Sequence, residues 1–371
     1  MKLLWATAKR LASDLASTTQ LAVSKELTKR GWEVTLVAPE GDGVEELVNA
    51  AGCRFIGVTR SKKSGLGWLT FGSSLKRTLP TLLKENDFDV ALVEWQAVAG
   101  AISSLKYAET PWLIVDRSPP VFNSLIGRLQ RFEYQRAWRL ARRKDGAKGS
   151  VLKSEALADW HHAKQRIVKP VTLMEAGVDV SKFTIANFSG PVTIVHHGQL
   201  DEERDIERII HIGEILSARG LEFKIRMAGS GNRLNALQKT AYLQDWLEVI
   251  GPLPPEKIPE FLATGHIAIF PLPDSNIWRL ASPLKVREWA AVGLPMILSD
   301  ITPHRSVGER DWIKLVSSNA TLDEWADSVE ILLQLDLLSL GKQARTDAEL
   351  EFDWKYTTEE LNTRLLELKG D

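Results

Sequence analysis

The sequence has almost no cysteine and no long apolar run. Its 371 residues include one cysteine, Cys53, which excludes a disulfide framework and a four-cysteine metal site and favours a reducing compartment. No stretch approaches the roughly 20 apolar residues that a membrane-spanning helix needs, and the N-terminal apolar run is too short for a signal peptide. We therefore expect a soluble, cytoplasmic protein.

Net charge is also nearly absent. The chain carries 47 Lys+Arg against 48 Asp+Glu, so it lacks the overall basic character of a nucleic-acid-binding protein. The charge is nevertheless unevenly placed: residues 1–185 hold 28 basic and 19 acidic side chains, and the remainder holds 19 and 29. This division predicts two units that face different partners, with separate drift of surface charge as the alternative.

Short apolar runs alternate with segments of helical period, and 371 residues favour two domains. The pattern predicts two doubly wound α/β domains with parallel sheets that face each other across a ligand-binding cleft. We place the domains at residues 1–184 and 185–371, joined near 184–190, with the option that the last helix packs back on the first domain. The predicted strands are Lys2–Ala8, Glu33–Ala38, Arg54–Val58, Phe88–Glu94, Trp112–Val115, Gly149–Lys153, Pro191–His196, Glu222–Ala228, Leu247–Ile250, His266–Phe270 and Pro295–Ser299.

The segment SPLKVREWAAVGLP, Ser282–Pro295, carries the clearest chemistry. Ser282 suits a helix N-cap, and Pro283 suits the first helical position. Free N–H groups at this helix start would suit a diphosphate, and Lys285 and Glu288 share one face of the first turns. A lysine beside phosphates and a carboxylate that accepts from sugar hydroxyls fit a nucleotide sugar. The alternative is an ordinary capped helix with a salt bridge.

Several motifs, in this order, carry a family resemblance. They are GQLDEERD at 198–205, MAGSGNRL at 227–234, IGPLPPEKIPEFLATGHIAIFPLP at 250–273, SPLKVREWAAVGLPMILSD at 282–300 and FDWKYTTEEL at 352–361. Together they resemble the retaining glycosyltransferases of the GT-B fold, family 4 (glycosyl transferases group 1). The resemblance implies two Rossmann-like domains, the first binding an acceptor and the second a nucleotide-sugar donor.

The resemblance also implies an activity. The enzyme would move a hexosyl group from a UDP- or GDP-sugar to a lipid-linked or polysaccharide acceptor, with retention of configuration, in the synthesis of cell-surface polysaccharide. It would need neither a metal nor another cofactor, since the nucleotide sugar is itself the donor substrate.

Carried over position by position, the resemblance assigns roles to individual residues. Glu288 would bind the donor ribose, while Arg204 and Lys285 would stabilise the departing diphosphate, as electrostatic catalysis requires. His197, directly before Gly198, could touch the donor from the strand end. The other residues assigned to the donor are Gly198, Gln199, Gly229, Gly231, Gly251, Leu253, Ser282, Pro283, Leu284 and Val286.

Three positions depart from the family pattern. Leu280 stands where the first glutamate of the Glu-x7-Glu pair is expected, and Gln199 stands where an arginine is expected. The glycine pair after the first strand is replaced by SDLASTTQ at Ser13–Gln20. These changes keep two alternatives open: a catalytically inactive GT-B subunit that binds a partner, and a sugar-nucleotide epimerase of the same fold.

The acceptor is expected to meet the ends of the N-terminal strands. Asp116 and Arg117 follow the strand in WLIVDRSPP, where either could orient an acceptor hydroxyl or phosphate. A salt bridge at the strand end is the alternative. The weaker candidates are Glu94, Gln96, Ser17 and Thr18.

Basic residues concentrate at Arg128–Lys148, where eight basic side chains are interleaved with Phe132, Tyr134 and Trp138. The segment Ser61–Phe71 adds Lys62 and Lys63 among aromatic residues. Basic and aromatic side chains together favour an anionic bilayer surface. We therefore expect peripheral docking on the inner face of the membrane, with a solvated helix face as the alternative.

Overall fold

The computed structural model describes residues 1–12, 17–61, 67–120 and 125–370, and the chain forms two compact units. Unit 1 comprises Met1–Ala176 with Trp354–Asp371, and unit 2 comprises Gly177–Asp353. The chain thus enters unit 2 before residue 184, because Val178 N–H already donates to Phe352 O at 2.8 Å. Ser13–Ala16, Lys62 and Lys63, which the sequence analysis names, lie outside the described residues.

Unit 1 is built on a parallel sheet of seven strands in the order β3-β2-β1-β4-β5-β6-β7. All five residues of both β4 and β5 are buried, as expected of parallel strands covered on both faces. The strand order reverses between β1 and β4. The strands are β1 Lys2–Ala6, β2 Glu33–Pro39, β3 Arg54–Val58, β4 Val90–Glu94, β5 Trp112–Asp116, β6 Ser150–Leu152 and β7 Val171–Leu173.

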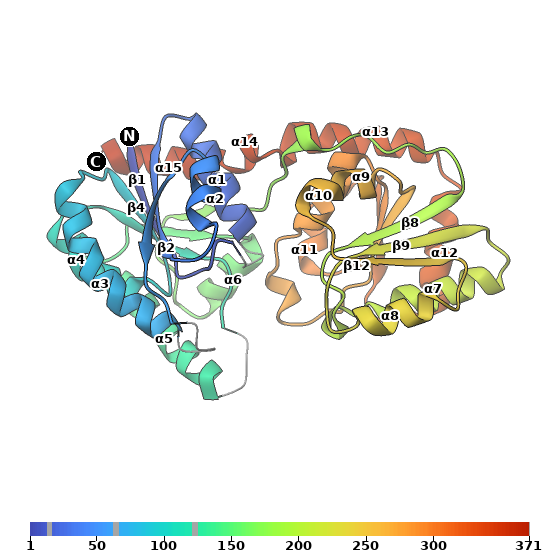
Figure 1. Ribbon diagram of the computed structural model, residues 1–371, viewed down its shortest axis with the longest axis horizontal. Coiled ribbons are helices and arrows are strands. Elements are labelled where there is room, and N and C mark those ends of the chain that lie inside the picture. The colour runs from blue at the N-terminus through green and yellow to red at the C-terminus, as the bar shows by residue number, and fades with distance from the viewer. Residues whose placement is uncertain (13–16, 62–66, 121–124, 371) are drawn as a thin grey trace. The chain divides into compact units, whose positions relative to one another are not determined.

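The helices of unit 1 include two from the end of the chain (Figure 1). Trp32 Nε1 donates to Asn362 at 3.0 Å, and Arg364 donates to Lys148 O at 2.8 Å, so α15 is fixed to the first unit. This contact is the physical reason that the last helix returns. The helices are α1 Ser17–Lys29, α2 Val44–Ala50, α3 Gly67–Glu85, α4 Val98–Tyr107, α5 Leu125–Ala141, α6 Glu155–Ala163, α14 Trp354–Thr357 and α15 Glu359–Gly370.

Unit 2 repeats the plan with six parallel strands in the order β10-β9-β8-β11-β12-β13. Here the order reverses between β8 and β11. The strands are β8 Val192–His197, β9 Phe223–Ala228, β10 Leu247–Gly251, β11 Ile267–Phe270, β12 Met296–Asp300 and β13 Ile313–Ser317.

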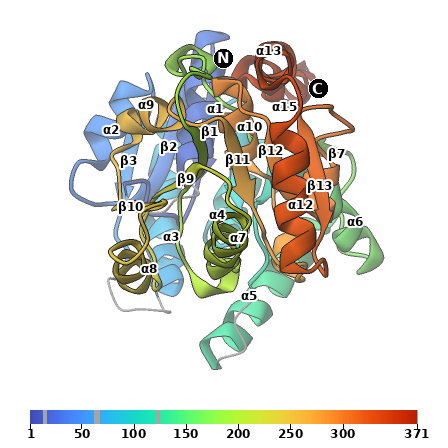
Figure 2. The same cartoon turned by 90° about the vertical axis from the view of Figure 1, so that its right-hand side faces the viewer.

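The helices of unit 2 cover both faces of its sheet, with α7, α8 and α12 on one face and α9, α10 and α13 on the other (Figures 1 and 2). A capping box fixes the start of α12: Thr321 Oγ1 accepts from Glu324 N–H, and the Glu324 carboxylate accepts from Thr321 N–H. The helices are α7 Glu207–Ala218, α8 Leu234–Ala241, α9 Ile258–Leu262, α10 Leu284–Val292, α11 Thr302–Arg305, α12 Leu322–Leu333 and α13 Leu337–Asp347. Single turns are η1 Val180–Lys182, η2 Glu202–Arg204, η3 Pro255–Lys257, η4 Trp278–Leu280 and η5 Ala348–Phe352.

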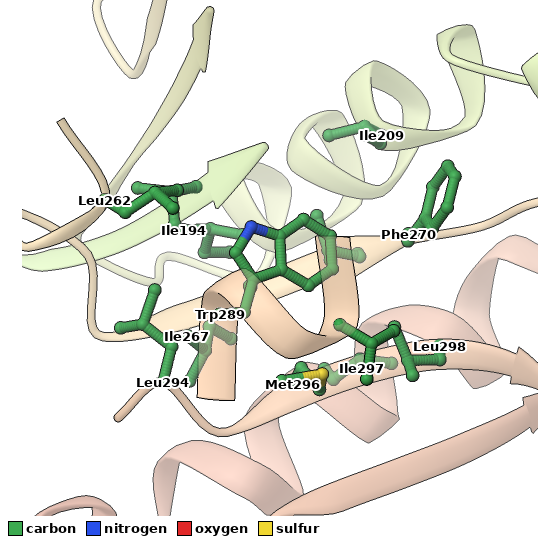
Figure 3. Packing of buried hydrophobic residues seen from close by; sticks show 14 of the residues in the cluster. Ile194, Ile209, Leu262, Ile267, Phe270, Trp289, Leu294, Met296, Ile297 and Leu298 are labelled. Carbon is green, nitrogen blue, oxygen red and sulfur yellow. The ribbon is translucent and has the colours of Figure 1, made fainter. Parts of the chain in front are cut away.

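The core of unit 2 surrounds Trp289 of α10, which is fully buried. Figure 3 shows its indole among side chains from β8, β11 and α9, including Ile194, Phe270 and Leu262. A large buried indole contributes several kcal/mol of packing energy, so Trp289 holds α10 against the sheet. No described helix combines the length and the apolar character needed to cross a membrane.

The fold class is as the sequence predicted, and two details differ. The sequence analysis named no strand at Val171–Leu173 or Ile313–Ser317, both of which lie at sheet edges. Ser282 does not cap α10: Pro283 is the N-cap residue, with ψ 87°, and no side chain caps the helix. The helix therefore begins one residue later than predicted, because Pro283 is not in a helical conformation.

Unit 2 is expected to lose stability in mild acid because of His304. This side chain is 1% exposed, its Nδ1 lies 2.7 Å from Ser299 O, and burial lowers its pKa to about 4. In the unfolded chain His304 therefore binds a proton near pH 6.5, whereas in the folded chain it binds one only near pH 4. The free energy of unfolding should fall between these values by about 3 kcal/mol in total.

Urea unfolding between pH 7 and pH 4, followed by circular dichroism, measures this loss. His304→Asn keeps a donor for Ser299 O and should reduce the pH dependence, while the exposed His211→Asn should not; burial also lowers the pKa of His196, so part of the dependence should remain. An unchanged slope in His304→Asn would show that His304 does not carry the effect.

Candidate functional site

In unit 2 the candidate residues gather at the carboxyl ends of β8, β9 and β11, where the strand order reverses. Ligands of open α/β sheets bind at such a point. His197 ends β8, Gly229 follows β9, and α10 begins after the connection that leaves β11. The position therefore follows from topology before any side chain is considered.

The connections after β8 and β9 approach each other too closely for side chains. A Cβ on Gly229 would lie 1.6 Å from Gly198 O, and a Cβ on Gly198 would lie 2.6 Å from Lys285 Cε. Gly231 is similarly close to Leu200 O, at 2.3 Å. Gly229 N–H donates to Gly251 O at 2.7 Å, so the ends of β9 and β10 are joined as well. The glycines thus let the backbone of the connections after β8 and β9 pack closely beside Lys285.

Lys285 is a buried cation without a partner. Its Nζ is shielded from solvent and has no hydrogen-bond partner among the residues described, and it lies 4.4 Å from the centre of the Phe270 ring. Burial, followed by the nearby charge of Arg204, lowers the pKa of Lys285 well below its usual range, while Glu288 and Asp201 oppose the shift. An anion placed here would supply the missing partner.

Arg204 lies near Lys285 and is held by an aromatic ring. Its guanidinium carbon is 4.5 Å from the centre of the Trp278 ring, and Trp278 Nε1 donates to Glu203 O at 3.1 Å. Burial lowers the pKa of Arg204, against the opposing charges of Asp201 and Glu203. Since arginine remains charged in proteins, the arrangement provides one fixed positive charge beside the adaptable one of Lys285.

Glu288 is oriented by a chain of hydrogen bonds through His197. Trp289 Nε1 donates to His197 Nδ1 at 3.0 Å, and His197 Nε2 lies 2.9 Å from Glu288 Oε2. An indole N–H can only donate, so Nδ1 must accept and the ring proton resides on Nε2. His197 therefore donates to Glu288 Oε2. Glu288 Oε1 has no hydrogen-bond partner in the described part of the chain, so it is available to a ligand hydroxyl.

The first turn of α10 presents N–H groups without partners inside the helix. Leu284, Lys285 and Val286 begin this helix, and Leu284 N–H donates to Ser282 O at 3.0 Å. Val286 is fully buried and anchors the turn against the core. The turn therefore offers backbone donors in the segment that also carries Lys285 and Glu288.

In unit 1, Asp116 is enclosed instead of facing a ligand. It is 0% exposed, and its Oδ2 accepts from the Tyr134 hydroxyl and lies 2.8 Å from His161 Nε2. Its Oδ1 accepts from Ser118 N–H at 3.0 Å. Burial and the Asp116 charge raise the pKa of Tyr134, so the phenol stays protonated and donates. Asp116 thus holds the start of a loop in place. The predicted contact of Asp116 with an acceptor does not fit this enclosed position.

The remaining acceptor candidates divide by exposure. Arg117 and Glu94 are buried, at 9% and 2% exposure, whereas Gln96 is half-buried and Thr18 is exposed. Ser17 begins α1, and its side chain lies outside the description. Glu94 is paired with Lys9 at 4.0 Å. Glu94 ends β4 and Arg117 follows the adjacent strand β5, so both lie at the carboxyl end of the sheet.

Comparison with known proteins agrees with this architecture. Residues 191–335 match the family model described as Glycosyl transferases group 1. A sucrose-phosphate synthase from Thermosynechococcus elongatus superimposes with a TM-score of 0.77 at 14% identity, covering 100% of this chain and 99% of its own. The chain has the GT-B fold.

Two further GT-B structures are similar over the same extent. Anabaena HepE in complex with UDP gives a TM-score of 0.75 at 12% identity, covering 99% of this chain and 100% of its own. A glycosyltransferase from Rickettsia africae gives 0.76 at 15%, covering 99% and 98%. No curated protein matches the sequence. The GT-B resemblance predicted from the motifs is therefore confirmed, at the level of the fold for the whole chain and of the family model for residues 191–335.

Two of the three departures from the GT-B family pattern, Leu280 and Gln199, do not lie in the hydrogen-bond chain around Glu288. Leu280 is half-buried in η4, which packs against α11, and Gln199 is half-buried beside Gly198. The loop before Leu280 is held by Arg279, which pairs with Asp274 at 2.7 Å. The local structure is thus ordered without the first glutamate.

The structure adds residues that the sequence analysis missed. Trp278 stacks on Arg204, and Trp289 fixes the tautomer of His197. In unit 1, Lys153 follows β6 with a pKa lowered to about 8 by burial. None of these had a local sequence signal, because each depends on a partner that is distant in the chain.

Proposed function

We propose that this GT-B protein transfers a hexosyl group from a nucleotide sugar to a glycan or lipid-linked acceptor, with retention of configuration. The observation that carries the proposal is the unpartnered Lys285 ammonium beside Arg204 and beside a Glu288 carboxylate with one available oxygen. A nucleoside diphosphate supplies what each group lacks: anionic oxygens for the cations and ribose hydroxyls for the carboxylate.

Solved complexes of proteins with a similar fold support the same ligand class. HepE has been solved with UDP and with UDP-glucose, and Staphylococcus aureus TarM with UDP and a glycosyl glycerol. We therefore propose UDP as the first nucleotide to test, with GDP as the alternative.

We further propose that the charge of the leaving diphosphate is met by protein groups, without a metal cofactor. Lys285, Arg204 and the first-turn amides of α10 provide donors where charge develops when the glycosidic bond to phosphate breaks. An assay with excess EDTA should then retain full transfer, and loss of transfer with EDTA would contradict this part.

A thermal-shift series with UDP, GDP, ADP and their sugar conjugates tests the donor. One nucleotide at 100 times its Kd should stabilise the protein by about 2.7 kcal/mol. Glu288→Ala should weaken that nucleotide by about 10-fold or more, because the ribose loses a charge-assisted hydrogen bond. The exposed Glu256→Ala, in the same unit, is the matched control.

The same series separates the rival functions. A protein that binds no nucleotide would be the inactive subunit, for which Leu280 and Gln199 are the motivating departures. Conversion of a UDP-sugar without any acceptor would identify an epimerase. Transfer to an acceptor with the anomeric configuration preserved, read by NMR, completes the test of the proposal.

We propose that α5 docks on an anionic bilayer at the inner face of the membrane. Its first turns project from unit 1 (Figures 1 and 2), and four apolar side chains on it are exposed: Leu125 at 77%, Ile126 at 39%, Leu129 at 52% and Phe132 at 56%. Exposed Arg128, Arg136 and Arg139 accompany them. An apolar stripe flanked by arginines fits a bilayer rather than water.

Co-sedimentation with phosphatidylglycerol vesicles is expected at low salt and should weaken at high salt. Leu129→Ser/Phe132→Ser should weaken binding by more than about 10-fold, since each side chain contributes roughly 1–2 kcal/mol of burial. Leu243→Ser, 76% exposed in unit 2, is the control. Equal binding by the double variant would contradict docking through α5.

A further inference from the structure

Positive side chains follow three strands of unit 1, on both sides of the point between β1 and β4 where its strand order reverses. Lys9 follows β1, Arg117 follows β5 and Lys153 follows β6. Asp116 and Leu152 are the last paired residues of β5 and β6, so Arg117 and Lys153 begin two adjacent connections. This edge of a parallel sheet is the one at which ligands bind.

Arg117 is a buried cation whose N–H donors lack acceptors among the described residues. It is 9% exposed, yet within the described ranges its guanidinium makes no hydrogen bond or ion pair, and Nη1 is wholly shielded from solvent. Burial lowers the pKa of Arg117, and the charge of Glu94 only partly opposes this. A guanidinium has five N–H donors, and burying it without acceptors is costly.

Lys153 lies in the same group of charges. Burial lowers its pKa to about 8; Asp116 opposes the shift, and Lys9 and Arg117 add to it. Asp116 already accepts hydrogen bonds from Tyr134 and Ser118, and Lys153 forms no ion pair with any carboxylate in the portion of the chain described. Arg117 and Lys153 therefore lie near two carboxylates, Asp116 and Glu94, that already have other partners.

We propose that Arg117 and Lys153 bind a phosphoryl group of the acceptor. The proposal rests on the proposed transferase function and names the acceptor class within it. A phosphoryl group carries a charge of about −1.5 to −2 at pH 7, which matches two cations. A carboxylate carries one charge and would be satisfied by the fork of Arg117 alone, leaving Lys153 without a role.

The test uses inorganic phosphate and the full chain, with Lys285→Met as background so that the unpartnered lysine of unit 2 does not contribute. Calorimetry should show phosphate binding in Lys285→Met. Adding Arg117→Met or Lys153→Met should weaken it at least about 10-fold, because a charge-assisted hydrogen bond is lost. The exposed Arg143→Met should leave it unchanged. Undiminished binding in either of the first two double variants would overturn the proposal.

Protonation and stability give independent readouts. At pH 8 phosphate binding should take up about half a proton, since the bound anion raises the pKa of Lys153, and the Lys153→Met variant should show no uptake. Without phosphate, Arg117→Met should melt no lower than its parent, because it removes an unpartnered buried charge. A lower melting temperature would mark Arg117 as structural and overturn the proposal.

Further arms separate the sources and the two hypotheses. Glucose 1-phosphate should compete with phosphate and bind at least about 10-fold more tightly than glucose. If glucose 1-phosphate and glucose bound equally, the site would take only free phosphate, and the acceptor assignment would be overturned. If acetate bound as tightly as phosphate, the site would be a carboxylate site, which would also overturn the assignment. If a nucleotide binds the wild type but phosphate does not bind Lys285→Met, only this inference fails. If phosphate binds through Arg117 and no nucleotide binds anywhere, the proposed transferase fails.

Discussion

Replacing Lys285 with methionine is expected to abolish sugar transfer while leaving the fold at least as stable as the wild type. The ammonium is buried without a hydrogen-bond partner among the residues described, so the unliganded protein gains little from it. Methionine keeps the length and the apolar stem against Phe270. Loss of one charge-assisted hydrogen bond should weaken UDP by about 10- to 150-fold, and kcat should fall by a further 10²–10³ if the charge acts mainly on the leaving group.

The expected proton balance makes the result specific to Lys285. Because burial lowers its pKa, a diphosphate beside it should raise that pKa again, and nucleotide binding should take up a proton at pH values between the two. Calorimetry in buffers of different ionisation enthalpy measures this uptake, which Lys285→Met should lack. Lys239→Met, an exposed lysine on α8, is the control. Full activity in Lys285→Met would remove the lysine from the mechanism.

Most strands were predictable because both sheets are parallel and covered on both faces. A strand such as β11, Ile-Ala-Ile-Phe, is then a continuous apolar run that local pattern reveals. The edge strand β7 has only three residues, two of them half-buried, so its pattern is too short and too mixed to stand out. Local pattern therefore gave the interior of each sheet and one of its two edge strands, and missed the other.

The sequence places the two central residues of the candidate site together but does not give their hydrogen-bond partners. Lys285 and Glu288 share a helix, so their spacing alone places them together. The hydrogen bond between His197 and Glu288 joins residues 91 apart, and only the packed structure brings the ends of β8 and α10 into contact. Asp116 shows the converse: the sequence places it at the ligand edge, but Tyr134 and His161, from two later helices, enclose it.

Gly229→Ala is expected to have the largest effect on the fold of unit 2. A Cβ there would lie 1.6 Å from Gly198 O and 2.7 Å from Gly198 C. These atoms are backbone, and Gly198 N–H is itself bonded to Ala228 O at 2.8 Å, so the connections after β8 and β9 would have to separate. We expect a loss of about 3 kcal/mol or more in unfolding free energy, and no measurable nucleotide binding.

A control variant, Gly220→Ala, separates the effect of steric crowding from the effect of a left-handed backbone. Gly220, after α7, has φ +79° and no atom within 4 Å of an added Cβ, so Gly220→Ala should cost only about 1 kcal/mol from the left-handed backbone. Urea unfolding and UDP titration of the two variants then measure the clash alone. If Gly229→Ala matched Gly220→Ala in both, the close approach of the β8 and β9 connections would not be what shapes the space around Lys285.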